Sequence, residues 1–511
     1  MIPESVTTSG PLTARAEGPA PGERLSRFLK RGRFPLLVLL GIAIFCEAAW
    51  LVFLTPNEAD LLHYECYGVT FWLGSHGSAL LPHDACAYLF QGVPTPPPTS
   101  PLPFHMLPIE YPPLTILPFS LPLLAPLPYY ALAFVVMMTL VAGLLYLLLA
   151  RSGAGRAAPI FLLYLLLGAA GVFQERFDLL PAACTLLCLL AAERGRWRAA
   201  YVALALGALL KIYPIVMLPA LFLAEQQSRT AQAEPTSKQQ SELAQTEHSE
   251  QNEGQDQIEQ KCEQNEGQAQ AEQTRAQRSG LVRAWSGVRR WRWSNCLLCI
   301  GLLLAVTGGF ALLNVQDALI SPLHYFLARP VQIEALAGSA IWSAGHFGIP
   351  YTIDFTFGSL NLESGLSRLL SPLDTLLMLA GLLFLLWLQW RRRIDLAQAM
   401  VGLVCLLMAT GKVFSPQYLL WLIPLLAYLY ACGKTSRAWM YCWAAISLLT
   451  TCIYTFYYSH LTDPRLDAQI VQTLPGFFEL VLLRNLLLLG ATIAFLGGWW
   501  GVRRDASTTP R

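Results

Sequence analysis

The 511-residue sequence contains little charge, since Asp, Glu, Lys and Arg make up only 13% of it, against about 25% in an average soluble protein. The formal net charge is +2, so the charge balance gives no reason to expect a nucleic acid as partner. The segments expected to face outward lack HExxH, DxD and Cys/His clusters, and the chain has no glycine-rich nucleotide loop. No motif therefore requires a metal ion, a cofactor or a nucleotide.

Hydrophobic residues are abundant, at 54% of the chain, and the mean hydropathy is +0.45. Apolar runs of about twenty residues recur, which is the length that a bilayer core of ~30 Å requires. The first run, Phe34 to Leu54, follows a tail (1–33) that ends in several basic residues and is not followed by a small-residue cleavage site. We therefore expect an all-α polytopic membrane protein with its N-terminus in the cytoplasm.

The later apolar segments are separated by alternating basic clusters, which mark cytoplasmic ends. One of these segments, 199–224, has basic sequence at both ends and contains Lys211 and Pro214 at its middle. Proline interrupts helices, so we interpret it as two half-length helices; a single full span, which would put the following linker outside, is the alternative. The total is then about twelve transmembrane helices. The segments after the first lie at 128–150, 157–173, 179–193, 199–224, 294–313, 372–390, 396–411, 416–431, 438–458 and 476–499.

The organisation predicted from these segments has two transmembrane modules and large external loops. Residues 225–293 begin with a Gln- and Glu-rich stretch that has few aromatic or branched side chains, so it cannot bury enough apolar area to offset its ordering entropy. The predicted parts are a cytoplasmic tail (1–33), an N-terminal catalytic module (34–224) with a first external loop (55–127), a disordered cytoplasmic linker (225–293), a C-terminal module (294–501) with an external loop (314–371), and a cytoplasmic tail (502–511).

Two cysteines, Cys66 and Cys86, lie in the first external loop. An oxidising compartment would allow a disulfide between them, and two ordinary thiols are the alternative. The sequence leaves both open.

Several motifs lie at the predicted outward boundaries of the apolar segments and have a recognisable order. They are Asn57-Glu58-Ala59-Asp60, Glu110-Tyr111-Pro112-Pro113-Leu114, and the stretches 175–182, 328–335 and 412–421. Together they resemble glycosyltransferase family 87, the polyprenyl-phosphate-mannose-dependent mannosyltransferases of the GT-C type, over roughly 34–224 and 294–500. The resemblance implies a GT-C fold in the cell membrane. It also implies inverting transfer of a hexose, most often mannose, from a polyprenyl-phosphate-sugar donor to a lipid or glycan acceptor at the external face.

The resemblance places the catalytic aspartate at the start of the first external loop, which is Asp60 here. Its role would be to take the proton from the acceptor hydroxyl. Glu58 and Glu65 are the local rivals, and a carboxylate that caps a short helix is the structural alternative.

Cations are expected to hold the donor phosphate, because arginine's planar fork suits phosphate oxygens. The alternatives are an internal Arg–Asp pair, a solvated loop face and lysines that extend to lipid headgroups. The predicted substrate-binding residues are Tyr111, Arg176, Asp178, Lys211, Arg329, Gln332, Glu334, Lys412, Gln417 and Tyr418.

A transporter or flippase of a lipid-linked saccharide is the second functional hypothesis. Such proteins often show internal repeats and sites near the bilayer midplane. No clear repeat is present, and the candidate polar residues gather on one predicted side. The pattern therefore favours an enzyme over a transporter. The sequence does not indicate the oligomeric state.

Overall fold

The computed structural model describes residues 59–82, 86, 101–169, 172–231, 291–461 and 466–498. All of them belong to one compact unit that begins at Asn57. The N-terminal tail, the first apolar run, most of the linker and the C-terminal tail lie outside the described residues. The predictions for those parts stay predictions.

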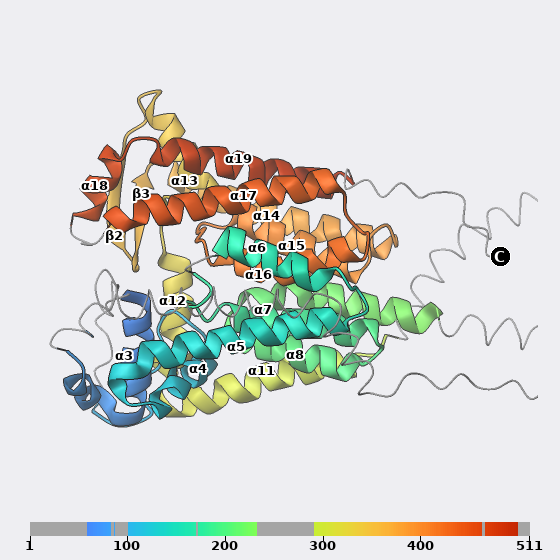
Figure 1. Cartoon of the computed structure of the whole chain (residues 1–511), viewed down its shortest axis with the longest axis horizontal. Helices are drawn as coiled ribbons and strands as arrows, with labels where there is room; N and C mark the ends of the chain where they lie inside the picture. The colour runs from blue at the N-terminus through green and yellow to red at the C-terminus, as the bar shows by residue number, and fades with distance from the viewer. Residues whose placement is uncertain are drawn as a thin grey trace, which may run out of the picture. The chain divides into compact units, whose positions relative to one another are not determined.

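Apolar helices dominate the described part of the chain (Figure 1). Five are long and apolar enough to cross a membrane: α5 with the turn before it (Leu127–Arg151), α11 (Ser294–Leu313), α14 (Ser367–Trp390), α17 (Arg437–Tyr457) and α19 (Phe477–Leu496). Shorter apolar helices are α6 (Ala157–Ala169), α7 (Leu179–Glu193), α8 (Trp197–Leu210), α15 (Leu396–Thr410) and α16 (Tyr418–Ala431). Helices α7 and α11 begin and end where the hydropathy predicts, whereas the total of about twelve spans stays a prediction.

The proline-rich segment before α5 is broken into short pieces, because proline cannot continue a regular helix. It consists of 3-10 turns around a five-residue helix, α4 (Ile116–Ser120), and the turns include Pro113–Thr115 and Leu121–Leu124. Tyr130 at the start of α5 donates a hydrogen bond to the carbonyl of Phe119 at 2.9 Å. The segment is thereby packed back against the helix that it precedes.

The helix break predicted around Lys211 and Pro214 is present. α8 ends at Leu210, Lys211 has an extended backbone with φ −156° and ψ 137°, and a 3-10 turn over Tyr213–Met217 follows. Helix then resumes at 218–231. Whether the two pieces are half-length membrane helices stays a prediction.

Helix 218–231 continues past residue 225, where the linker was expected to begin; the linker itself stays a prediction. Glu225 is fully buried and accepts a hydrogen bond from Asn295 at 2.8 Å. Gln226 exchanges two hydrogen bonds with the backbone of Arg292, each 3.2 Å long. These contacts hold the helix end against the segment that enters α11, and composition alone does not reveal them.

A three-stranded antiparallel sheet departs from the all-α expectation. Its order is β1 (Val331–Gln332), β3 (Ser359–Ser364) and β2 (Tyr351–Thr356). The β2–β3 hairpin turns at Phe357 and Gly358, which both have positive φ (52° and 66°), as a tight two-residue hairpin of the favoured twist requires. The sheet packs with α13 (Leu336–Gly345) and α19 around Ile333, Ile341, Leu362 and Phe477.

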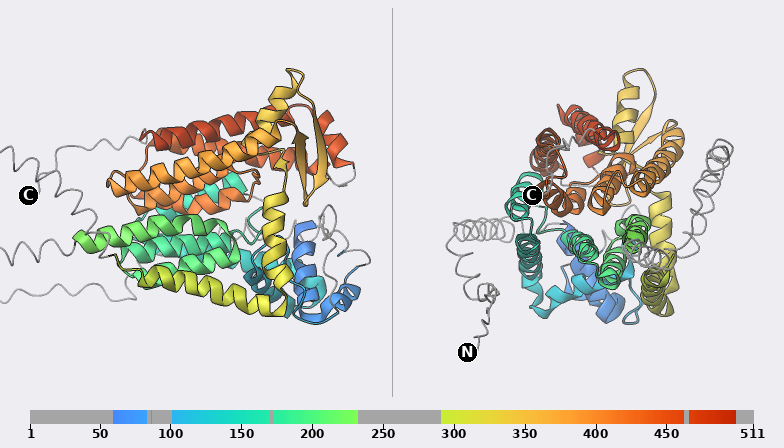
Figure 2. Two further views of the ribbon diagram at one scale, coloured as in Figure 1. Left: turned by 180° about the vertical axis from the view of Figure 1, so that it is seen from behind. Right: turned by 90° about the vertical axis from the view of Figure 1, so that its right-hand side faces the viewer.

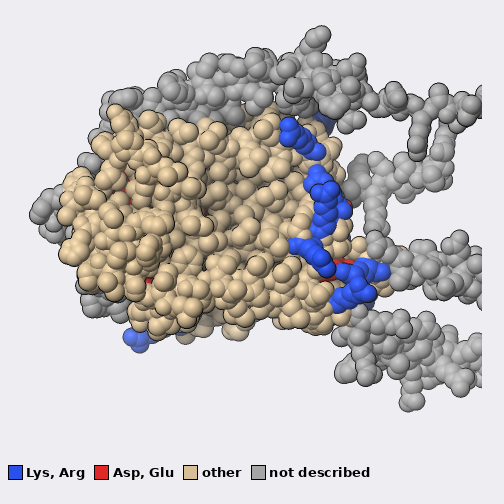
Figure 3. Space-filling view, turned by 90° about the horizontal axis from the view of Figure 1, so that it is seen from below, with Lys and Arg blue, Asp and Glu red and all other residues tan. Residues whose placement is uncertain are grey.

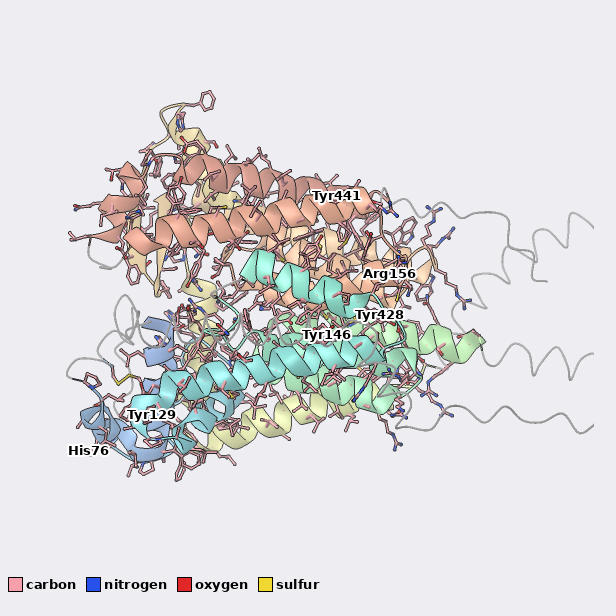
Figure 4. The ribbon with its side chains drawn as sticks, viewed as in Figure 1. His76, Tyr129, Tyr146, Arg156, Tyr428 and Tyr441 are labelled. Atoms are coloured by element: carbon pink, nitrogen blue, oxygen red, sulfur yellow. A yellow bond between two sulfur atoms is a disulfide. The ribbon has the colours of Figure 1, made fainter. Side chains whose placement is uncertain are left out.

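The two ends of the helical unit differ in their side chains. Most Lys and Arg side chains visible in Figure 3 gather at one end. Arg156 lies toward this end in Figure 4, whereas His76 and Tyr129 lie at the opposite end. Figures 1 and 2 show α12 (Ser321–Ala328) lying crosswise to the long helices, near the end that carries α3 (Ala59–Leu73) and the sheet.

Candidate functional site

Helix α3 presents one polar and aromatic face to the rest of the unit. Asp60 lies in its first turn, and His63, Tyr64 and Tyr67 follow at spacings that place them on the same face. Tyr64 and Tyr67 are 1% and 4% exposed. A Cβ on Gly68 would meet the carbonyl oxygen of Phe119 at 2.8 Å, so glycine allows α3 to approach α4 closely.

The structure pairs Cys66 of α3 with Cys86 in a disulfide. Of the two alternatives that the sequence left open, the structure therefore contains the disulfide. The bond ties the middle of the helix that carries Asp60 to a residue twenty positions further along the chain.

Asp60 forms an ion pair with Arg176. Arg176 belongs to the short turn between α6 and α7, where its backbone N–H donates to the carbonyl of Val172 at 3.1 Å. Burial alone would lower the pKa of Arg176, but Asp60 and neighbouring tyrosines raise it above its ordinary value. The pair is partly accessible, with side-chain exposures of 18% for Arg176 and 33% for Asp60.

A second ion pair joins Asp178 to Lys211 across the helix break, with 2.5 Å between Nζ and Oδ1. Trp421 of α16 donates its indole N–H to the same carboxylate oxygen at 2.5 Å. The Lys211 ammonium also lies 5.0 Å from the ring centre of Phe177 and 5.7 Å from that of Tyr111. Both distances are within the range of a cation–π interaction.

Arg329 follows the end of α12 and faces the same group of residues. Its Nη2 donates to the Ser359 hydroxyl at 2.9 Å, and its guanidinium lies 5.4 Å from the ring centre of Tyr325. Burial alone would lower its pKa, but Tyr325, Tyr418 and Glu110 raise it. Its buried Nε has no hydrogen-bond partner among the described residues.

Glu110 and His63 form a third polar pair that sequence reasoning did not assign to the site. His63 Nε2 lies 3.1 Å from Glu110 Oε1. Burial would raise the pKa of Glu110, but His63, Arg329 and Arg176 together hold it below its ordinary value. Two signals in the sequence could have found the pair: His63 is one helical turn after Asp60, and Glu110 begins the Tyr-Pro-Pro motif.

Contacts and electrostatic interactions thus bring together six of the residues predicted from the sequence. They come from α3, the segment before α4, the turn before α7, the helix break and the end of α12. These residues are Asp60, Tyr111, Arg176, Asp178, Lys211 and Arg329, and Tyr418 interacts with Arg329.

Glu334 has a different environment from the one expected of a substrate-binding residue. Its side chain is fully buried, and its Oε2 lies 2.6 Å from Nη1 of the equally buried Arg484. Tyr458 donates a hydrogen bond to the other oxygen. Both carboxylate oxygens are bound to protein groups inside the fold, which favours a structural role. Direct substrate contact by Glu334 stays a prediction.

The remaining predicted residues hold loops together beside Arg329. The backbone N–H of Gln332 donates to the carbonyl of Lys412 at 2.9 Å, and Lys412 Nζ lies 3.5 Å from the carbonyl oxygen of Leu327. Gln417 Oε1 accepts from the Ser415 hydroxyl at 3.0 Å. These contacts do not join Gln332, Lys412 or Gln417 to the two ion pairs.

Comparison with known protein families gives a match over part of the chain. Residues 110–234 match the model of the family described as Glycosyltransferase family 87. The matched range contains Glu110, Arg176, Asp178 and Lys211, whereas Asp60 and Arg329 lie outside it. Neither a curated protein nor a solved structure matched the chain. The resemblance to glycosyltransferase family 87 is therefore confirmed over residues 110–234 and, with the apolar helices, indicates a membrane glycosyltransferase.

Proposed function

We propose that this protein transfers a hexose from a polyprenyl-phosphate-sugar donor to a hydroxyl group of a lipid or glycan acceptor, with inversion at the anomeric carbon. Mannose is the proposed sugar, on the family resemblance. The observation that carries the proposal is the state of Arg329, a half-buried guanidinium beside two completed ion pairs. Within the described residues its side chain bonds to the Ser359 hydroxyl, and its buried Nε has no partner.

The charges of the site support a phosphate ligand. Asp60 is matched by Arg176 and Asp178 by Lys211, whereas Arg329 makes no carboxylate ion pair within the described part of the chain. Glu110 interacts with Arg329 electrostatically but forms no ion pair with it in the described residues, and an incompletely paired charge away from water is costly. A donor phosphate would supply that charge, and its oxygens fit the planar fork of arginine.

The proposed step needs one base and one leaving group. The acceptor oxygen bonds to the anomeric carbon from the face opposite the phosphate, and the bond between that carbon and the phosphate oxygen breaks. The bonding electron pair leaves with the polyprenyl phosphate, whose charge increases by one and is stabilised by Arg329 and Arg176. The acceptor proton passes to Asp60, which lies beside Arg176.

We place the site at the external face of the cell membrane. Basic side chains gather at one end of the unit (Figure 3), and such clusters mark the cytoplasmic side. Helix α3 and α12 lie near the opposite end (Figure 1). A transporter is less well supported, because residues 110–234 match a glycosyltransferase family.

The test is transfer by the purified protein in proteoliposomes that contain polyprenyl-phosphate-[¹⁴C]mannose and an extracted lipid acceptor. We expect a labelled product of inverted anomeric configuration and a large rise in the donor KM for Arg329→Ala, partly restored in Arg329→Lys. The proposal fails if no polyprenyl-phosphate-hexose is used, or if the product retains the donor's configuration.

A further inference from the structure

We propose that Glu110, oriented by His63, binds a hydroxyl group of the transferred sugar and so helps to select that sugar. This inference rests on the proposed function, because it assigns a sugar-recognising group to the same site. Carboxylates are strong acceptors for hydroxyl donors, since hydrogen bonds to a charged group are stronger than those between neutral groups.

The position of Glu110 fits this role. One carboxylate oxygen faces His63, and the group interacts electrostatically with both Arg329 and Arg176. In the proposed function these two arginines bind the phosphate, to which the sugar is directly bonded. A carboxylate that interacts with both arginines is therefore a candidate to bind a sugar attached to that phosphate. Its side chain keeps 15% exposure, so it is not sealed from a ligand in the way that Glu334 is.

The segment that carries Glu110 is held in place from both sides. The backbone N–H of Ile109, the residue before it, donates to the Tyr67 hydroxyl at 3.3 Å. Pro112, two residues later, fixes its own φ at −55°, as proline does. His63 packs edge-on against Tyr67, with 4.9 Å between ring centres. A carboxylate fixed in this way loses little freedom on binding a ligand.

The charge of Glu110 supports the same role. His63 and the two arginines lower the pKa of Glu110 despite its burial, so the group is an ionised hydrogen-bond acceptor rather than a poised proton carrier. In glycosyl transfer, positive charge develops on the sugar ring in the transition state. A fixed anion beside the ring would stabilise that charge as well as orient the hydroxyl.

The test compares intact donor with four analogues, the 2-, 3-, 4- and 6-deoxy forms of polyprenyl-phosphate-mannose. For each, kcat/KM is measured with the wild type and with Glu110→Gln in proteoliposomes. We expect the wild type to discriminate against one or more of these analogues by about 10- to 100-fold, the range that one hydrogen bond to a charged group provides. Glu110→Gln should lose most of this discrimination at one sugar position and keep it at the others.

The ratio between two donors is independent of how much of the preparation is folded, so a partly unstable variant still gives an answer. Glu363→Gln is the matched control, because Glu363 is an exposed carboxylate on β3, and it should keep every ratio. His63→Gln should shift the same ratio as Glu110→Gln, by a smaller factor, because glutamine can still donate to Glu110.

The experiment distinguishes failure of the Glu110 role from failure of the proposed function. If the wild type transfers the hexose and Glu110→Gln leaves all four ratios unchanged, the role of Glu110 is wrong and the proposed function stands. If the wild type uses no polyprenyl-phosphate-hexose at all, the proposed function itself fails.

Discussion

Replacement of Arg484 by Met should strongly destabilise the protein. The Arg484 guanidinium is fully buried in α19, where it binds the side chain and the backbone carbonyl of Glu334 at 2.6 Å each. It also lies 4.0 Å from the ring centre of Phe414, and Asn485 donates to the same Glu334 carbonyl at 3.0 Å. Removing one partner leaves a buried charge uncompensated, which costs about 3–5 kcal/mol.

The assay titrates the purified protein with SDS in mixed micelles. Unfolding is monitored by tryptophan fluorescence. We expect Glu334→Gln and Arg484→Met each to lower the free energy of unfolding by about this amount. The double variant should lose less than the sum of the two, because the charges are then removed together. If Glu334→Gln instead unfolded like the wild type and raised only the donor KM, Glu334 would be a substrate-binding residue and the structural role assigned here would be wrong.

Two further predictions concern the disulfide of α3 and Asp317, which lies in the turn before α12. Replacing both Cys66 and Cys86 by Ala opens a loop of sequence separation 20 and should lower the free energy of unfolding by about 3 kcal/mol; the unchanged stability of a fully reduced wild type would contradict this. Burial raises the pKa of Asp317 from 3.8 to about 7, so the wild type should lose stability as the pH rises from about 4 to 7, because the unfolded chain gives up this proton first. Asp317→Asn should remove that loss, and an unaltered pH profile of unfolding for this variant would refute it.

The helices could be predicted from the sequence because their signal is local. A run of apolar residues with a basic cluster at one end and polar residues at the other fixes its own ends, as for α7 and α11. The β2–β3 hairpin could not be predicted in this way, since its six-residue strands lie in a segment interpreted as an external loop. The sheet is stabilised by apolar packing against α19, more than a hundred residues later in the chain.

The candidate site was only partly predictable for the same reason. Asp60, Arg176 and Arg329 could be named from motifs, but their neighbours are set by tertiary contacts. Glu334 looked like a loop residue because its partner, Arg484, lies 150 positions away in an apolar helix. His63 and Glu110 likewise meet only when α3 packs against the segment before α4.

The central claim is that Asp60 is the base, and Asp60→Asn tests it most directly. The measurement is the initial rate of hexose transfer at saturating donor in proteoliposomes, together with donor affinity and thermal unfolding of the same preparation. We expect kcat to fall by about 10²–10⁴-fold while the donor still binds. Loss of the ion pair with the partly accessible Arg176 should lower the thermal stability, although asparagine caps a helix about as well as aspartate. Normal activity of this variant would contradict the claim and transfer the role to Glu58, Glu65 or Asp178.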